Sequence, residues 1–133
     1  YKDISNFEEY LHNNGIVVVK FFLNVSKKEQ GKRLIDRINE LDKNWKFEEG
    51  DIKERGFWND YMKAYEDMIQ HTSSTNAPWH IIPADDKKNM RLLVAKVIKE
   101  TLEKLPIDYP ESTPERQKQL KKLIETIQKQ DKE

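Results

Sequence analysis

The chain has 133 residues, a length that suits one modest domain. Its 24 basic and 24 acidic residues cancel, so no overall field draws it to nucleic acid or to an anionic membrane. Cysteine is absent, which excludes disulfides and thiolate catalysis, and the three histidines are too widely separated to suggest a metal site. No apolar run is long enough to span a bilayer and no signal-like N-terminus is visible, so we expect a cytoplasmic protein.

The first expected element is a short helix over residues 4–13. Ser5 and Glu8 have the spacing of a capping box, in which the hydroxyl and the carboxylate each accept a backbone N–H at the start of a helix. Gly15 follows the helix in a segment suited to the left-handed conformation. The apolar side of this helix is formed by Ile4, Phe7 and Leu11.

The strongest signal in the sequence is the apolar run over residues 16–25, which only Lys20 and Asn24 interrupt. Such a run of β-branched and aromatic residues predicts a strand buried on both faces, as in parallel sheets. Ser26 and Glu29 repeat the capping-box spacing directly after it, so a helix is expected from Ser26 to about residue 38. Open α/β sheets place their ligands where such a helix begins, at the carboxyl end of the strand.

Two arginines stand out on this helix. Arg33 and Arg37 are four residues apart, so they lie one above the other at the edge of its apolar stripe. The nearby Gly31-Lys32 is no phosphate loop, because the Walker pattern needs a glycine five residues earlier and Ser or Thr after the lysine. The chain has Ser26 and Arg33 at those positions, and no phosphate-cradling loop occurs elsewhere in it.

A polar, irregular segment follows, in which Trp45 and Phe47 flank Lys46. Asp51 is then expected to cap a second helix, over residues 51–71. Plain core packing explains the stripe of this helix better than an aromatic ligand site does. The stripe consists of Trp58, Tyr61, Met62, Tyr65 and Ile69.

Lys53 and Arg55 lie in the first turn of this second helix, where a cation opposes the helix dipole. The placement gains nothing locally, which favours a partner anion. Pairing with Asp51, Glu48 or Glu49 explains the two cations about equally well.

A second, short buried strand is expected over residues 79–83, and Asp85 with Asp86 then caps a third helix that runs to about residue 105. The helical stretch between the strands favours parallel, right-handed pairing. One or two strong strands are too few for a self-sufficient sheet, so the chain looks like part of a domain. From residue 109 we expect a linker and then a helix over residues 114–130 that docks on the body or on a neighbour.

Five phrases, taken together and in order, resemble the family-2 polyphosphate kinases, which are P-loop phosphotransferases. They are Lys20-Phe-Phe-Leu-Asn-Val-Ser-Lys-Lys-Glu-Gln, Asp42-Lys-Asn-Trp-Lys-Phe, Lys53-Glu-Arg-Gly-Phe-Trp, Tyr61-Met-Lys-Ala-Tyr-Glu-Asp and Ala77-Pro-Trp-His-Ile-Ile-Pro-Ala-Asp-Asp-Lys-Lys. The resemblance covers residues 1–105 and is to the family's C-terminal half, so the family's Walker A loop and Walker B aspartate lie upstream of it. Asn24 departs from the pattern, since the family often has histidine there.

The resemblance implies an α/β fold: the C-terminal part of a P-loop kinase-like parallel sheet with flanking helices and a helical lid. Residues 1–108 would be the C-terminal half of the phosphotransferase domain, with the lid at about residues 26–71, and residues 109–133 a C-terminal linker and helix. The implied enzyme moves a phosphoryl group between inorganic polyphosphate and a nucleotide (AMP, ADP or ATP), with magnesium bound by ligands upstream of this chain. The sequence does not distinguish a mono- from a diphosphate acceptor. We also expect a homo-oligomer.

The resemblance also implies site residues. Charge develops on phosphate oxygens during phosphoryl transfer, so a basic lid is expected. Asp85 and Lys87 lie just beyond the second strand, where P-loop kinases commonly hold the nucleotide base. For each charged residue the alternative is a solvated surface position. The lid residues implied to bind phosphate are Arg33, Arg37, Lys46 and Arg55, with Lys32 and Lys53 as second choices.

Two other functions are compatible with the sequence. One is a non-catalytic helical interaction module, in which the helices over residues 51–71 and 114–130 present amphipathic faces to a partner. The other is a nucleic-acid binder that uses an aromatic and basic patch around Trp45 and Lys46. The zero net charge and the acids interleaved with that patch oppose the second function; they are Asp42, Glu48, Glu49 and Asp51.

Overall fold

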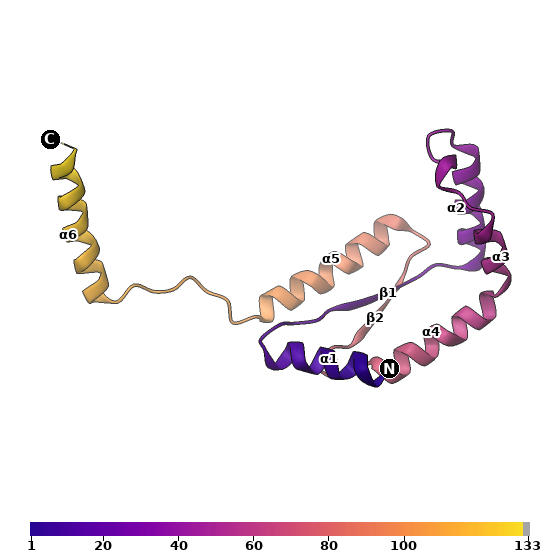
Figure 1. Cartoon of the computed structure of the whole chain (residues 1–133), viewed down its shortest axis with the longest axis horizontal. Coiled ribbons are helices and arrows are strands. Elements are labelled where there is room, and N and C mark those ends of the chain that lie inside the picture. Colours follow the sequence, from indigo (N-terminus) through magenta and orange to yellow (C-terminus); the bar gives the residue numbers. More distant parts are fainter. Residues whose placement is uncertain (132–133) are drawn as a thin grey trace. The chain divides into compact units, whose positions relative to one another are not determined.

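The computed structural model describes residues 1–131, which divide into two compact units. The first spans Tyr1–Glu103 and the second begins at Lys104. The second unit contains α6 (Pro114–Gln130). The elements that begin in the first unit are, in order, α1 (Lys2–Asn13), β1 (Lys20–Asn24), α2 (Lys27–Asn39), the 3₁₀ turn η1 (Asn44–Lys46), α3 (Gly50–Gly56), α4 (Trp58–Thr72), β2 (Trp79–Pro83) and α5 (Lys87–Lys104) (Figure 1).

The two strands form a parallel sheet, as the helical connection between them predicts. The register pairs Lys20 with Trp79 and Asn24 with Pro83. The Ala84 amide donates to the Asn24 carbonyl at 2.9 Å, just beyond the end of the ladder. Figure 1 shows α5 on one side of the strands and α1 and α4 on the other. This small parallel sheet with flanking helices confirms the predicted α/β fold class.

A buried ion pair connects α1, the sheet and the end of α4. The Lys20 ammonium donates to Glu8 Oε2 at 2.6 Å and to the Thr72 carbonyl at 2.5 Å. Both charged side chains are about nine-tenths buried, with 9% and 10% of their surface exposed. The Trp79 indole N–H donates to Thr72 Oγ1 at 2.9 Å, and its ring centre lies 5.3 Å from the Lys20 nitrogen. Each hydrogen-bonding group at this junction therefore has a partner despite its burial.

The strand predicted over residues 16–25 is too long, and its predicted burial on both faces is wrong. β1 begins at Lys20, because the five-residue β2 offers ladder partners only from that point. Ile16, Val17 and Leu23 are about half exposed. Burial falls along β1 from the buried Lys20 to the exposed Leu23 and Asn24, so the flanking helices cover only part of the strand.

The predicted start of the first helix is also wrong. α1 begins at Lys2, and its N-cap residue Tyr1 makes no side-chain capping bond. Ser5 lies inside the helix, where its amide donates to the Tyr1 carbonyl at 3.1 Å. Glu8 cannot complete a capping box, because its carboxylate binds Lys20.

The helix predicted over residues 51–71 is two helices. α3 starts at Gly50 without a side-chain cap, so Asp51 lies in the first turn and does not cap the helix. Phe57 then interrupts the helical backbone, with φ −88° and ψ 23°, before α4 begins. Gly56, a poor helix former, ends α3 just before this break.

The helix predicted over residues 114–130 is confirmed as α6. Thr113 Oγ1 accepts the Arg116 amide at 3.2 Å, and Pro114 occupies the first helical position, where its missing N–H costs nothing. Across residues 1–131, no helix has both the length and the apolar character needed to cross a membrane.

Candidate phosphate-binding cleft

A cleft of about 760 Å³ lies between the carboxyl end of β1 and the helices α2, α3 and α4. One wall is apolar and aromatic, and includes Phe22, Trp58, Tyr61 and Tyr65. The Phe22 and Tyr65 rings lie 5.1 Å apart between centres. The charged and polar side chains of the opposite wall come from α2 and α3. They are Gln30, Arg33, Arg37, Asp51, Glu54 and Arg55.

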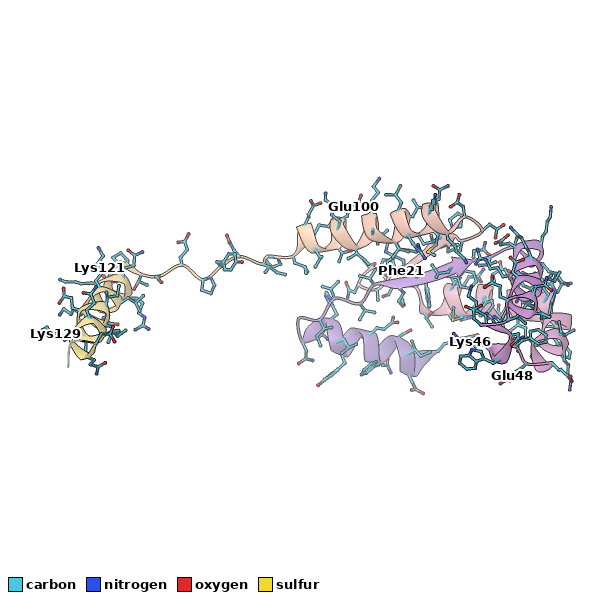
Figure 2. The ribbon with its side chains drawn as sticks, turned by 90° about the horizontal axis from the view of Figure 1, so that it is seen from above. Phe21, Lys46, Glu48, Glu100, Lys121 and Lys129 are labelled. Carbon is cyan, nitrogen blue, oxygen red and sulfur yellow. The ribbon has the colours of Figure 1, made fainter. Side chains whose placement is uncertain are left out.

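Three of the predicted lid residues share this cleft: Arg33, Arg37 and Arg55. Helical spacing places the first two on one edge of α2, and the turn between α2 and α3 brings the third to them. The other three predicted residues, Lys32, Lys46 and Lys53, are exposed and do not line it. Figure 2 shows Lys46 and Glu48 close together on the segment between α2 and α3.

Arg37 is the most loosely held of the three arginines. Its guanidinium approaches Asp51 Oδ2 at 3.8 Å, and both side chains are more than 40% exposed. Among residues 1–131 it makes no hydrogen bond. Because exposed ion pairs of this kind contribute little, Arg37 can exchange Asp51 for a phosphate oxygen at small cost.

Arg55 is held against α2. Its Nη1 donates to the Lys27 carbonyl at 2.8 Å and to Gln30 Oε1 at 2.6 Å. These bonds cross from α3 to α2 and fix the guanidinium at the cleft wall. The remaining nitrogens keep their donors for other acceptors.

Arg33 connects α2 to the end of β2. Its Nε donates to Glu29 Oε1 at 2.9 Å, and its Nη2 donates to the carbonyls of Ala84 and Asp85 at 2.8 and 2.9 Å. The guanidinium therefore contributes positive charge in the cleft and also joins α2 to the segment that follows β2.

Only one of the two hydrogen bonds of the predicted capping box forms at the N-terminus of α2. Ser26 Oγ accepts the Glu29 amide at 3.1 Å, which confirms the serine cap. The prediction that the Glu29 carboxylate accepts the Ser26 amide is wrong, because that carboxylate pairs with Arg33. The Ser26 amide instead donates to Asp85 Oδ1 at 2.7 Å.

Asp85 therefore does not cap α5, and Asp86 does so alone. Asp86 Oδ1 accepts the amides of Lys88 and Asn89 at 2.8 and 3.0 Å. Asp85 and the exposed Lys87 follow β2 closely, at the carboxyl end of the sheet, but neither lines the cleft.

Comparison with known proteins identifies the family. Residues 1–110 match the family described as Polyphosphate kinase 2 (PPK2). The chain belongs to the polyphosphate kinase 2 family.

Three relatives show how much of a family member it spans. It is 51% identical over 129 residues to the ADP-polyphosphate phosphotransferase of Rhodopseudomonas palustris, covering 97% of this chain and 45% of that protein. It is also 51% identical to the "Uncharacterized protein in chlN 3'region" of Leptolyngbya boryana, covering 95% of each. The crystal structure of Polyphosphate Kinase 2 from Arthrobacter aurescens TC1 superposes with a TM-score of 0.83 at 38% identity, over 94% of this chain and 44% of that one. The chain thus spans about half the length of the phosphotransferase and of the solved kinase, consistent with the C-terminal half.

Acidic side chains in the cleft are the main feature that sequence analysis of this polyphosphate kinase 2 chain missed. The sequence predicts Asp51 as a helix cap or as a partner of Lys53 and Arg55, and it assigns no role to Glu54. Tyr61 donates its hydroxyl to Glu54 Oε2 at 2.5 Å, and this hydrogen bond raises the pKa of Tyr61. The sequence signal for this pair is its spacing: seven residues, or two turns on the continuous helix predicted over residues 51–71, place Glu54 and Tyr61 on one face.

The described residues were compared with the ligand sets that hold metal ions in proteins. Over residues 1–131, no group of three or more His, Asp or Glu side chains is arranged to hold a metal ion.

Asp85 should titrate below the ordinary range of an aspartate. The hydrogen bond from the Ser26 backbone amide is the first cause of its lowered pKa, followed by the Ser26 side chain, with the charge of Arg33 adding to it. A depressed folded pKa means that the carboxylate stabilises the fold above its unfolded pKa of about 3.9, and that this is lost as the pH falls through the folded value. NMR titration of the Asp85 carboxyl carbon should give a midpoint below 3.9. Asp85→Asn should remove the matching pH dependence of the unfolding free energy, and a midpoint at or above the ordinary value would contradict the hydrogen-bonded arrangement.

Proposed function

We propose that this chain is the lid-bearing part of a phosphotransferase that moves a phosphoryl group between inorganic polyphosphate and a nucleotide, AMP or ADP. The observation that carries the proposal is the convergence of Arg33, Arg37 and Arg55 on one cleft at the carboxyl end of β1. Membership of the polyphosphate kinase 2 family supports the substrate class. The name of the Rhodopseudomonas palustris relative supports a nucleotide diphosphate as one acceptor.

The arginines act through position and charge. A guanidinium fork can bind two phosphate oxygens at once, so Arg37 and Arg55 would hold a polyphosphate chain in a fixed orientation. The same donors stabilise the charge that develops on the transferred group. The exposed Lys32, Lys46 and Lys53 would attract the polyanion to the lid without fixing its geometry.

The nucleotide base is proposed to lie near Asp85 and Lys87. Their place directly after β2 supports this, because ligands of open α/β sheets bind outside the carboxyl ends of the strands. Magnesium, if the reaction uses it, would take its ligands from residues outside this chain. We also propose a cytoplasmic, homo-oligomeric protein, as Sequence analysis leads us to expect.

The chain alone should not catalyse polyphosphate-dependent nucleotide phosphorylation, because its sequence contains no phosphate loop and no loop lysine. The measurement is magnesium-dependent ATP formation from ADP and polyphosphate by the purified chain. An Arg37→Ala preparation purified in parallel controls for contaminating kinases. ATP formation by the unmodified chain above that control would show that the chain is catalytic without a phosphate loop, contrary to this prediction.

A non-catalytic helical interaction module is the second candidate function. It is favoured by α6, whose apolar side chains Leu123, Ile124 and Ile127 are at least half exposed. A chain that binds no polyphosphate would favour this role over the phosphotransferase.

A further inference from the structure

Gly31 is an unexpected residue in the middle of α2. Glycine in a helix interior costs about 0.5–1 kcal/mol relative to alanine. The backbone gives no reason for glycine there, because Gly15 is the one residue with a positive φ angle among residues 1–131. The reason must therefore lie in what occupies the space of the missing side chain.

The Arg55 guanidinium occupies that space. A Cβ atom on Gly31 would lie 3.4 Å from Arg55 Cζ and only 2.9 Å from Arg55 Nη2, and the second distance is shorter than real Cβ atoms show. In the same position Arg55 Nη1 donates to the Lys27 carbonyl and to Gln30 Oε1. The guanidinium thus lies directly on the bare backbone of α2, held by two acceptors of that helix.

The other glycines of the lid do not have this role. A Cβ atom added to Gly50 or Gly56 would meet no atom within 4 Å. Both belong to α3, the helix that carries Arg55. The close approach is therefore specific to Gly31.

We propose that Gly31 is a positioning residue, whose missing side chain forms a seat on α2 that holds the Arg55 guanidinium in the cleft. The consequence for polyphosphate rests on the proposed function; the seat itself does not. A donor fixed before the ligand arrives loses less conformational freedom on binding, so the seat raises affinity through Arg55. A methyl group at position 31 displaces the flexible end of an arginine, which costs the fold little.

The test is Gly31→Ala in the 133-residue chain, with Gly50→Ala as the matched control. Gly31→Ala should shift the Arg55 Nε–Hε resonance and keep or raise the melting temperature, because alanine favours the helix. It should also weaken the binding of inorganic polyphosphate, measured by isothermal titration calorimetry, by about 3- to 10-fold. Gly50→Ala should leave the Arg55 resonance and the affinity unchanged.

A double-mutant cycle separates the seat from a general effect on the lid. Once Arg55→Ala has removed the guanidinium, Gly31→Ala should have no further effect on polyphosphate affinity. Arg55→Lys keeps the charge but cannot make the same two-acceptor contact, so it should lose affinity to a similar extent as Gly31→Ala.

The outcomes distinguish this inference from the proposed function. If the unmodified chain does not bind polyphosphate, the proposed function fails, while the Arg55 resonance still tests the seat. An unchanged Arg55 resonance in Gly31→Ala would overturn the seat. A shifted resonance with unchanged polyphosphate affinity would overturn Gly31 as a positioning residue.

Discussion

Replacing Lys20 by alanine should lower the free energy of unfolding by about 3–5 kcal/mol. The substitution leaves the Glu8 carboxylate, about nine-tenths buried, without its counter-ion. It also removes the donor to the Thr72 carbonyl. A buried charge without a partner is far more destabilising than the intact pair is stabilising, so the loss should greatly exceed that of a surface lysine.

Urea unfolding of the variant against the unmodified chain is the measurement. Lys63→Ala removes an exposed lysine from α4 and should change the unfolding free energy by less than about 0.5 kcal/mol. The double replacement Lys20→Met with Glu8→Leu should recover most of the loss, because apolar residues often substitute well for a buried pair. A loss for Lys20→Ala no larger than for Lys63→Ala would show that the pair is not buried in solution.

Replacing Arg37 by alanine should lower polyphosphate turnover by on the order of 10²-fold or more, in an enzyme that joins this chain to a phosphate-binding loop. The guanidinium makes no hydrogen bond within residues 1–131 and lies in the cleft with two other arginines, so its donors are available to phosphate. The melting temperature should change little, because the pair with Asp51 is long and exposed.

Asp51→Asn is the matched control for this result. If Arg37 serves only to pair with Asp51, the two variants should behave alike. If Arg37 binds phosphate, Asp51→Asn should keep the turnover, since removing a nearby negative charge does not remove the donor. A near-normal kcat/KM for Arg37→Ala would show that Arg37 is a solvated surface residue and does not bind phosphate.

Local signals in the sequence predicted much of the fold. The hydrophobic run and the helical connection predicted the parallel pairing of β1 and β2. The caps at Ser26 and Asp86 depend on contacts within three residues, and both are confirmed. Features set by distant residues could not be predicted in this way. In the sequence Lys20 only interrupts an apolar strand, because its partner Glu8 lies twelve residues earlier, in α1, where its spacing from Ser5 instead predicts a capping box.

In the cleft, too, features that depend on local spacing could be predicted from the sequence, and contacts between distant residues could not. The four-residue spacing predicted that Arg33 and Arg37 share an edge of α2, and both line the cleft. The contact between the Ser26 amide and Asp85 joins residues 59 positions apart, which periodicity does not reveal. The seat that Gly31 provides for Arg55 likewise depends on how α3 packs on α2, and the sequence alone shows only an unfavourable glycine.

We propose that polyphosphate binds at the cleft that Arg33, Arg37 and Arg55 line. NMR titration of inorganic polyphosphate into the labelled chain tests it most directly, because the arginine side-chain resonances report the site itself. We expect saturable shifts of the Arg37 and Arg55 Nε–Hε resonances, and we expect the binding that they report to weaken with added salt. Shifts confined to the α6 lysines that Figure 2 labels, Lys121 and Lys129, or no saturable shift at all, would contradict it.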